Sequence, residues 1–338
     1  MLARSHRLGA LVSRRVLSIV GALALAGAVT VLPNVAGGSI SGHATALTPV
    51  TSQISLQQAL QKALTAKSLP ANLTPSLIQL AGGASHFAGS SYEHANCNPY
   101  VYPSEAAHPQ PCWYGSKIAT APVIVIFGDS FVGNWIPALD LIGQHLKYRV
   151  ADFEFDSCIT PFVDTIGGPV VIPVAPACAT WHAQLAGSVV PLHPKAIIAA
   201  NGSSSWGSAD TSWLAGMKTA FTKLNPKGTS VQILLGTGPH LSTPSPACLS
   251  AYSSNLQHCT FHYSSTSEFQ KALNRDAQAA STVGVHVVKT FQWVCLSRAC
   301  PMAVASATVF VDSDHLSVVY SKYLYLLLQS SLKPLLSL

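Results

Sequence analysis

The sequence predicts an α/β protein of three layers, in which a mostly parallel sheet of five strands lies between helices. Two observations support this fold class. Short, continuous apolar runs alternate along the chain with longer segments in which apolar residues recur every three or four positions. Strands that alternate with helices are typical of parallel sheets covered on both faces. The 338 residues are enough for one large domain or two small ones.

The elements follow one another in a readable order after about residue 112. The first strand is predicted at Val123–Phe127, which is apolar throughout and ends at Gly128. Further strands are predicted at residues 148–155, 196–200, 231–235 and 285–288. Helices are predicted at residues 135–146, 180–189 and 213–224, from about 267, and after 317. Ser265 and Glu268 have the spacing of a capping box, and Ser317 is predicted to cap the last helix.

Residues 1–46 predict a signal peptide or a membrane anchor. Basic residues up to Arg15 precede an apolar run, Val16–Leu32, which is the order found in secretory signals. The triplet at residues 44–46, Ala-Thr-Ala, resembles a cleavage site. The run is slightly shorter than the ~20 residues of a membrane-spanning helix. Export is therefore expected, while cleavage and N-terminal membrane anchoring both stay open.

The rest of the chain divides by composition at about residue 90. Residues 47–90 are rich in Ala, Ser, Leu and Gln, and Ser55–Lys67 is predicted to be a helix. We interpret this segment as a linker or a helical preamble packed on the domain surface. Residues 91–338, where aromatic residues, prolines and cysteines appear, are predicted to form the functional domain.

Cysteine content and charge narrow the function classes. Eight cysteines fall into neighbouring pairs, which suggests disulfides closing short loops in an exported protein: Cys97/Cys112, Cys158/Cys178, Cys248/Cys259 and Cys295/Cys300. No paired Cys/His spacing of a zinc site occurs, so no metal site is expected. The net charge is +6, but four arginines lie within residues 1–46, and the remainder holds 15 basic and 13 acidic residues. Without a basic stripe, nucleic-acid binding is not expected.

Two short motifs carry candidate chemistry. Gly128-Asp129-Ser130 follows the first predicted strand and leads toward a helix, so the serine hydroxyl would be exposed at a strand end. Asp312 and His315 stand three residues apart just before the last helix. A serine becomes nucleophilic when an imidazole takes its proton and a carboxylate holds that imidazole in the right tautomer. Each motif alone is compatible with an ordinary turn or solvated loop, but together they predict a catalytic triad.

These motifs and several others resemble the SGNH (GDSL-type) hydrolase family, and most closely the SGNH domain associated with acyltransferase family three membrane proteins. The resemblance covers roughly 240 residues from Cys97 onward. Its other parts are Cys112-Trp113-Tyr114-Gly115, Asn134-Trp135-x-Pro137-Ala138-Leu139, Ser157-Cys158-x-x-Pro161, Cys178-x-x-Trp181, Thr237-x-Pro239 and Cys300-Pro301. The family fold is a flavodoxin-like α/β/α sandwich.

The resemblance implies acyl-ester chemistry at the cell envelope without a cofactor. It implies Ser130 as nucleophile, His315 as general base and Asp312 as the orienting carboxylate. The family's oxyanion hole uses the backbone N–H of the serine, a glycine after the second strand and an asparagine after the third, here Asn201. No glycine follows the second strand closely in this sequence, and Phe131 stands where related domains often have His.

The resemblance further implies an acylated glycan or other ester as substrate, and a membrane acyltransferase as a partner. The product would depend on whether the acyl group goes to water, as in an esterase, or to a sugar hydroxyl, as in an O-acetyltransferase. Four tryptophans are weighed as sugar-stacking residues against core packing: Trp135, Trp181, Trp206 and Trp213. Two alternatives stay open, namely an inactive SGNH-like accessory domain that binds glycans or an acyltransferase, and an anchored structural envelope protein.

Overall fold

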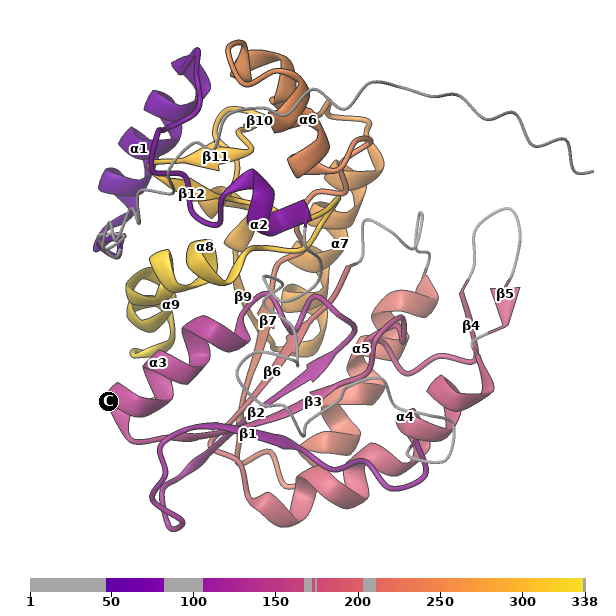
Figure 1. Cartoon of the computed structure of the whole chain (residues 1–338). Helices are drawn as coiled ribbons and strands as arrows, with labels where there is room; N and C mark the ends of the chain where they lie inside the picture. The colour runs from indigo at the N-terminus through magenta and orange to yellow at the C-terminus, as the bar shows by residue number, and fades with distance from the viewer. Residues whose placement is uncertain (1–46, 82–105, 167–171, 174, 203–210, 337–338) are drawn as a thin grey trace, which may run out of the picture. The chain divides into compact units, whose positions relative to one another are not determined.

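A six-stranded sheet lies at the centre of the fold in this computed structural model, which describes residues 47–81, 106–166, 172–173, 175–202 and 211–336 (Figure 1). Across the sheet the strand order is β1 (Cys112–Gly115), β3 (Arg149–Glu154), β2 (Val123–Gly128), β6 (Ala196–Ala200), β7 (Val231–Leu235) and β9 (His286–Val288). The last five strands are parallel and confirm the five predicted from their apolar runs. Their order is the flavodoxin-like one.

The sixth strand, β1, was not predicted from the sequence. It pairs antiparallel with β3 at the edge of the sheet, with Cys112 opposite Asp152 and Gly115 opposite Arg149. A four-residue edge strand that ends in a glycine with a φ of +75° has neither the length nor the apolar run by which the others are recognised.

The parallel register brings three strand ends to one level. Gly128 at the end of β2 is paired with Glu154 at the end of β3 and with Ala200 at the end of β6. Because β2 lies where the strand order reverses, the crevice beyond its carboxyl end is the usual ligand position in such sheets.

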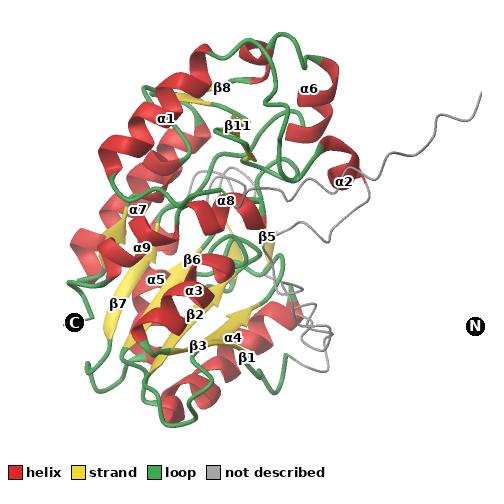
Figure 2. Cartoon of the chain, turned by 60° about the vertical axis from the view of Figure 1, so that its left-hand side comes forward, coloured by secondary structure: helices red, strands yellow, loops and turns green. Residues whose placement is uncertain are grey.

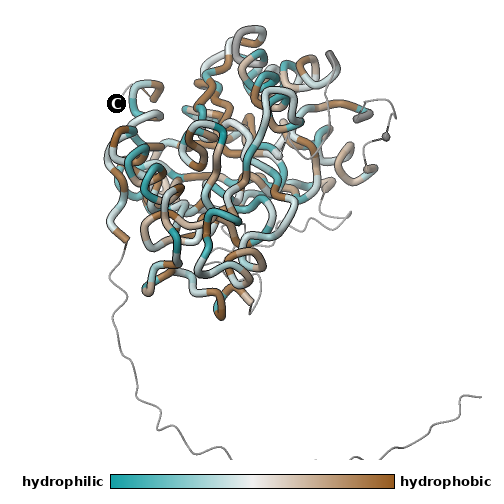
Figure 3. The backbone as a smooth tube through the Cα atoms, turned by 90° about the horizontal axis from the view of Figure 1, so that it is seen from above, coloured by the Kyte–Doolittle hydropathy of each residue, from teal (hydrophilic) through white to brown (hydrophobic). Residues whose placement is uncertain are grey.

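Helices cover both faces of the sheet (Figure 2). On one face, Ile124 and Ile126 lie in the same buried cluster as residues of α3 (Ile136–Leu146), α8 (Val318–Tyr323) and α9 (Tyr325–Leu332). On the other, Val125 and Phe127 share a cluster with residues of α4 (Pro176–Val189) and α5 (Thr211–Leu224). Figure 3 traces how hydrophobic and hydrophilic stretches alternate along the chain. The three predicted layers are confirmed.

Two helix starts test the predicted caps. The predicted capping box of Ser265 and Glu268 is wrong, because the helix α7 (Glu268–Val283) is capped by Ser267, whose hydroxyl accepts the N–H of Gln270. The Ser317 cap is confirmed, since its hydroxyl accepts the N–H of Tyr320 at 3.0 Å. The segment that follows Ser317 forms two short helices, α8 and α9, rather than one.

The smaller elements lie outside the central sheet. They are α2 (Leu77–Ala81), α6 (Ser245–Ala251), β4 (Thr165–Ile166), β5 (Ile172–Pro173), β8 (Phe261–His262), β10 (Ala299–Cys300), β11 (Ala303–Val304), β12 (Ala307–Thr308) and the 3₁₀ turns Val190–Leu192, Leu256–Cys259 and Thr290–Trp293. None of the helices in the described parts of the chain is long and apolar enough to span a membrane. The predicted signal peptide or anchor, residues 1–46, lies outside the described residues.

The segment before the domain contributes to its core. The predicted helix near residue 55 is α1 (Gln53–Thr65), which buries Leu56 and Leu60 in the cluster under α3. The indole N–H of Trp293 donates to the side-chain carbonyl of Gln53 at 3.1 Å. Residues 47–81 therefore pack as part of the same hydrophobic interior as the sheet.

Three of the four predicted disulfides are confirmed. The bridges Cys158–Cys178, Cys248–Cys259 and Cys295–Cys300 join cysteines 20, 11 and 5 residues apart. The fourth predicted pair includes Cys97, which lies outside the described residues. Short disulfide loops of this kind restrict the unfolded chain and are typical of proteins that fold outside the cytoplasm.

Two buried carboxyl groups on β3 form an unusual part of the core. Asp152 and Glu154 are 2% and 4% exposed, and their side-chain oxygens have no hydrogen bond of standard geometry from a described residue, although the backbone N–H of Glu154 lies near enough to Asp152 to lower its pKa slightly. Burial raises the pKa of Asp152 to about 8. Burial and the neighbouring Asp152 also raise the pKa of Glu154. A buried carboxyl without donors is stable mainly in its protonated form.

This arrangement predicts a stability that falls as pH rises. With a pKa of about 8 in the folded state against 3.8 ordinarily, Asp152 keeps a proton that the unfolded chain releases, so stability is lost as pH rises from about 4 to about 8. Asp152→Asn removes this loss. The measured quantity is the melting temperature of Asp152→Asn minus that of wild type at the same pH. We expect this difference to be several degrees larger at about pH 8 than at about pH 4.5.

The matched control is Asp164→Asn, which changes an exposed carboxylate. Thermal unfolding at both pH values checks the prediction. A difference between Asp152→Asn and wild type that stays constant with pH would contradict it.

Candidate active site

The turn after β2 places the Ser130 hydroxyl at the end of the sheet. Gly128 has a φ of +146°, and a Cβ atom there would lie 1.9 Å from the carbonyl oxygen of Ala200, so only glycine fits. From Asp129 onward the chain forms successive three-residue turns, and α3 begins only at Ile136. This start agrees with the helix predicted at residues 135–146, and Ser130 lies six residues before it.

His315, the predicted base, lies in a tight loop between residues 311 and 315. The carbonyl of His315 accepts the N–H of Val311 at 2.9 Å, which closes the loop. Inside it, Oδ1 of Asp312 accepts the backbone N–H groups of Asp314 and His315 at 2.9 and 2.8 Å. An aspartate that accepts N–H groups two and three residues ahead stabilises such a turn. The three-residue spacing of Asp312 and His315 is therefore built by the aspartate itself.

The structure brings all three predicted triad residues together. Nε2 of His315 lies 2.8 Å from Oγ of Ser130, and Nδ1 of His315 lies 2.7 Å from Oδ2 of Asp312. The imidazole side chain is 18% exposed and Asp312 46%. An Asp–His–Ser chain of hydrogen bonds with these lengths has the geometry needed to move a proton from the hydroxyl to the imidazole.

A second carboxylate, not predicted from the sequence, approaches the same imidazole. Oδ1 of Asp314 lies 3.2 Å from Nδ1 of His315, and Oδ2 of Asp314 lies 2.8 Å from Nδ1 of His240. His240 belongs to the loop after β7, so two histidines from distant parts of the chain share one carboxylate. The motif Asp-x-Asp-His could have indicated Asp314 from the sequence, whereas no local pattern indicated His240.

His315 and Asp312 each shift the pKa of the other. Burial opposes the charge on His315, but the hydrogen bond and charge of Asp312, with the charges of Asp314 and Asp129, outweigh it and raise the pKa of His315. Burial opposes the charge on Asp312 as well, yet its hydrogen bonds and the charge of His315 leave its pKa lowered. The carboxylate is thus ionised and the imidazole is a stronger base than usual.

Two buried polar side chains hold the three loops in place. The carboxylate of Asp129 accepts the N–H of Phe131 at 3.0 Å and the N–H of Gly202 at 2.8 Å, which ties the turn after β2 to the turn after β6. The side-chain oxygen of Asn134 accepts the N–H of Leu316 at 2.7 Å, which ties the base loop to the start of α3. Asp129 and Asn134 are 2% and 3% exposed.

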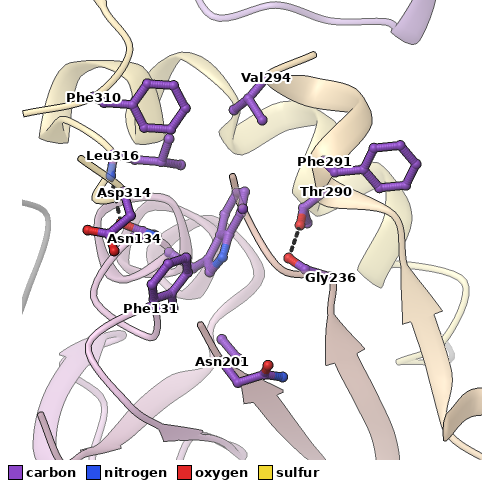
Figure 4. Close-up of a pocket in the computed structure, with 13 residues that line it drawn as sticks. Phe131, Asn134, Asn201, Gly236, Thr290, Phe291, Val294, Phe310, Asp314 and Leu316 are labelled. Atoms are coloured by element: carbon purple, nitrogen blue, oxygen red, sulfur yellow. Dashed lines mark hydrogen bonds between the residues drawn. The ribbon is translucent and has the colours of Figure 1, made fainter. Parts of the chain in front are cut away.

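Asn201 follows β6 directly and lines a cavity together with Phe131 and Asp314. Its side chain is 1% exposed, and in the described part of the chain neither end of its amide has a hydrogen-bond partner. It lines a narrow cavity of about 20 Å³ (Figure 4). The other lining residues include Phe131, Trp135, Gly236, Thr290, Phe310, Asp314 and Leu316. A buried amide without a partner is rare, and in a cavity it is available to a ligand.

Phe131 occupies the space beside the base. Its ring lies 5.6 Å from the His315 imidazole, centroid to centroid, and is 4% exposed. A Cβ atom on Gly202 would approach this ring to 2.6 Å, so the glycine lets the ring pack against the Asn201 turn. Phe131 thus supplies an apolar wall rather than a polar contact.

The loop after β3 contains an unexpected left-handed residue. Ser157 has a φ of +59° and is exposed. The loop runs along the nucleophile turn, because the N–H of Phe155 donates to the carbonyl of Gly128 and the hydroxyl of Thr160 donates to the carbonyl of Ala200, both at 2.9 Å. A residue in this conformation is typical of positions where glycine is favoured. The sequence did not reveal it.

The tryptophans weighed as sugar platforms pack in the interior where they are described. Trp135, Trp181 and Trp213 are 5%, 1% and 4% exposed, and Trp206 lies outside the described residues.

Two groups of described residues bring three potential metal ligands within 4.8 Å of one another. They are Cys158, Cys178 and His182, of which both cysteines form a disulfide, and Asp312, Asp314 and His315 of the base loop.

Comparison with known families decides the relationship. Residues 96–328 match the family described as "SGNH domain (fused to AT3 domains)". The chain belongs to this SGNH family. Membership supports action on acyl esters and confirms the resemblance drawn from the motifs. A search of curated proteins gave no match.

Two solved structures resemble this SGNH domain. One is the periplasmic domain of a lipopolysaccharide acetyltransferase from Salmonella ser. Paratyphi A, with 15% identity, a TM-score of 0.50, and coverage of 73% of this chain and 99% of that one. The other is a lipase/acylhydrolase from Enterococcus faecalis, with 14% identity, a TM-score of 0.37, and coverage of 63% and 96%. The first likeness supports the fold.

The electrostatics of the base loop yield a prediction that requires no substrate. Replacing Asp312 by Asn removes the strongest acceptor and charge at Nδ1 of His315. We expect the pKa of His315 to fall by about one pH unit or more, since a carboxylate within 4 Å stabilises the imidazolium. An NMR titration of the His315 ring protons measures this. Ser313→Ala, a neutral change in the same loop, should leave the titration in place, and an unmoved pKa in Asp312→Asn would refute the assignment.

Proposed function

We propose that this SGNH domain is a serine esterase or O-acyltransferase with Ser130 as nucleophile. The observation that carries the proposal is the hydrogen-bond chain from Oγ of Ser130 through His315 to Asp312, at 2.8 and 2.7 Å. It supports His315 as the general base and Asp312 as the group that fixes its tautomer.

The proposed reaction has two halves. Oγ of Ser130 attacks the ester carbonyl carbon while its proton passes to Nε2 of His315. The tetrahedral intermediate then expels the alcohol, which takes the proton from Nε2 as the carbon–oxygen bond breaks. The acyl-serine that remains is attacked by water or a sugar hydroxyl, whose proton passes to His315 and then to Oγ of Ser130. This sequence needs no cofactor, because the triad supplies both nucleophile and base.

The oxyanion of the intermediate needs donors that are already in place. We assign this role to the backbone N–H of Ser130 and to the side-chain amide of Asn201, whose buried N–H has no described partner. For the loop after β3, where related domains have a glycine, we assign the N–H of Ser157, because its positive φ reproduces a glycine-like backbone. Donors that are fixed in advance stabilise the developing charge.

We propose acetyl as the acyl group. The Salmonella neighbour is described as the periplasmic domain of a lipopolysaccharide acetyltransferase. Acetyl esters are therefore the proposed substrates.

The proposed setting is the cell envelope. Three disulfides and the apolar N-terminal sequence support an extracytoplasmic location, secreted or membrane-anchored. The matched family is described as fused to AT3 domains, and the Salmonella neighbour acts in lipopolysaccharide acetylation according to its description. We therefore propose acylated envelope glycans as substrates and a membrane acyltransferase as partner.

The first test is hydrolysis of p-nitrophenyl acetate by residues 47–338. Ser130→Ala and His315→Ala should each lower kcat by about 10⁴- to 10⁶-fold, since each removes a member of the triad. The wild type should prefer p-nitrophenyl acetate to p-nitrophenyl butyrate.

The pH profile is a separate prediction. Because the pKa of His315 is raised and the base must be neutral, the rate should decline on the acid side at a pH above the ordinary 6.5.

A fluorophosphonate probe separates this proposal from an inactive accessory domain. Labelling of the wild type that disappears in Ser130→Ala supports an enzyme even if the test ester is a poor substrate. Folded wild type that neither reacts with the probe nor exceeds its Ser130→Ala variant in hydrolysis would favour the accessory domain.

The oxyanion role of Asn201 has its own test. Asn201→Ala should lower kcat by about 10²- to 10³-fold with little change in KM, because an oxyanion donor acts in the transition state. Asn274→Ala, an exposed change on α7, serves as the matched control. Equal kcat values for the two variants would remove Asn201 from the oxyanion hole.

A further inference from the structure

We propose that His240 is a positioning residue of this site: it holds the second carboxylate, Asp314, so that Asp312 alone orients the imidazole of His315. The proposal rests on the proposed function of the triad, but its main measurement is independent of activity.

Asp314 contacts two histidines, and it lies closer to His240 than to His315. Its Oδ2 lies 2.8 Å from Nδ1 of His240, while its Oδ1 lies 3.2 Å from Nδ1 of His315. Asp312 is closer to the same nitrogen, at 2.7 Å. Nδ1 of His315 has one proton to donate, and two carboxylates compete for it. The hydrogen bond from His240 leaves Asp314 as the weaker competitor.

The direction of the imidazole depends on which carboxylate prevails. With Nδ1 aimed at Asp312, Nε2 lies 2.8 Å from Oγ of Ser130. A shift toward Asp314 would turn the ring and lengthen the contact with Ser130. Because an error of even 1 Å in position reduces catalysis substantially, control of Asp314 matters for the rate.

The place of His240 does not depend on its bond to Asp314. The N–H of Leu241 donates to the carbonyl of Ser313 at 2.7 Å, and the N–H of Ser245 donates to the carbonyl of Asp312 at 3.0 Å. These two backbone bonds join the loop after β7 to the base loop. Loss of the His240 side chain, which is 53% exposed, should therefore leave the loops joined.

His240 also affects the charge around the base. The groups that face His315 are Asp312 and Asp314 from its own loop, and Asp129 from the end of β2. His240 faces Asp314 from the loop after β7. Its Nδ1–H donates to the carboxylate of Asp314 and so reduces the negative charge that Asp314 presents to His315. Without His240, the full charge of Asp314 acts on His315.

Two substitutions separate positioning from charge. His240→Ala removes the donor, whereas in His240→Asn an amide N–H takes the place of Nδ1–H but cannot gain a proton. Asp314→Asn removes the carboxylate on which both effects depend. Combining His240→Ala with Asp314→Asn completes a double-mutant cycle.

The deciding experiment is an NMR titration of His315 in these variants of the full chain, with melting temperatures to confirm folding. His240→Ala should raise the pKa of His315 by roughly 0.3 to 1 pH unit at low salt, and less at about 1 M salt. The same substitution in the Asp314→Asn background should cause no shift. An unchanged pKa, or a shift that persists in the Asp314→Asn background, would overturn the proposal.

Kinetics supply the second readout. His240→Ala should move the acid limb of kcat/KM upward with the titration and lower kcat by roughly two- to tenfold, and His240→Asn should restore kcat at alkaline pH. A kcat that His240→Asn does not restore would argue against positioning by hydrogen bonding. If no variant or wild type shows activity, the proposed function fails while the titration still tests the role of His240.

Discussion

The parallel pairing of β2 with both of its neighbours constrains everything at the site. Because Gly128 is level with Glu154 and Ala200, the turns after β2, β3 and β6 leave the sheet at one height. The same crowding leaves only 1.9 Å between a Cβ atom at position 128 and the carbonyl of Ala200, so a glycine is required there. A buried carboxylate, Asp129, then joins two of these turns. The backbone of the sheet thus sets the positions of Ser130 and Asn201 independently of the loop that carries His315.

His315, the proposed base, contacts Ser130 from 185 residues further along the chain. Asp312 stabilises the turn of the loop that carries His315, and Asn134 and the loop after β7 hold that loop in position. The carboxylate that orients the imidazole also builds the loop that presents it. This double use explains why the spacing of aspartate and histidine is so short, and why the pair is readable in the sequence.

Local patterns predicted the parts of the structure that are specified locally. Apolar runs gave the five parallel strands, and the two motifs gave Ser130, Asp312 and His315. Contacts between distant segments had no such signal. His240 meets Asp314 across 74 residues, and the left-handed backbone of Ser157 arises from a loop packed against β2 and β6. Tryptophans at 135, 181 and 213 also show the limit, since composition cannot distinguish a buried ring from an exposed one.

Negative charge gathers around the reacting groups, and its balance sets the working range of the site. Asp312, Asp314 and Asp129 all raise the pKa of His315, which makes the imidazole a stronger base but leaves it protonated, and so unable to accept the Ser130 proton, over more of the neutral range. Asp152 and Glu154 add no negative charge to this field while they are protonated. Burial raises the pKa of both groups, to about 8 for Asp152. Deprotonating them would destabilise β3 and place new charge beside the nucleophile turn, since Glu154 pairs with Gly128. The stability of the sheet and the strength of the base therefore depend on the same property, which is how much negative charge the end of β2 and β3 carries.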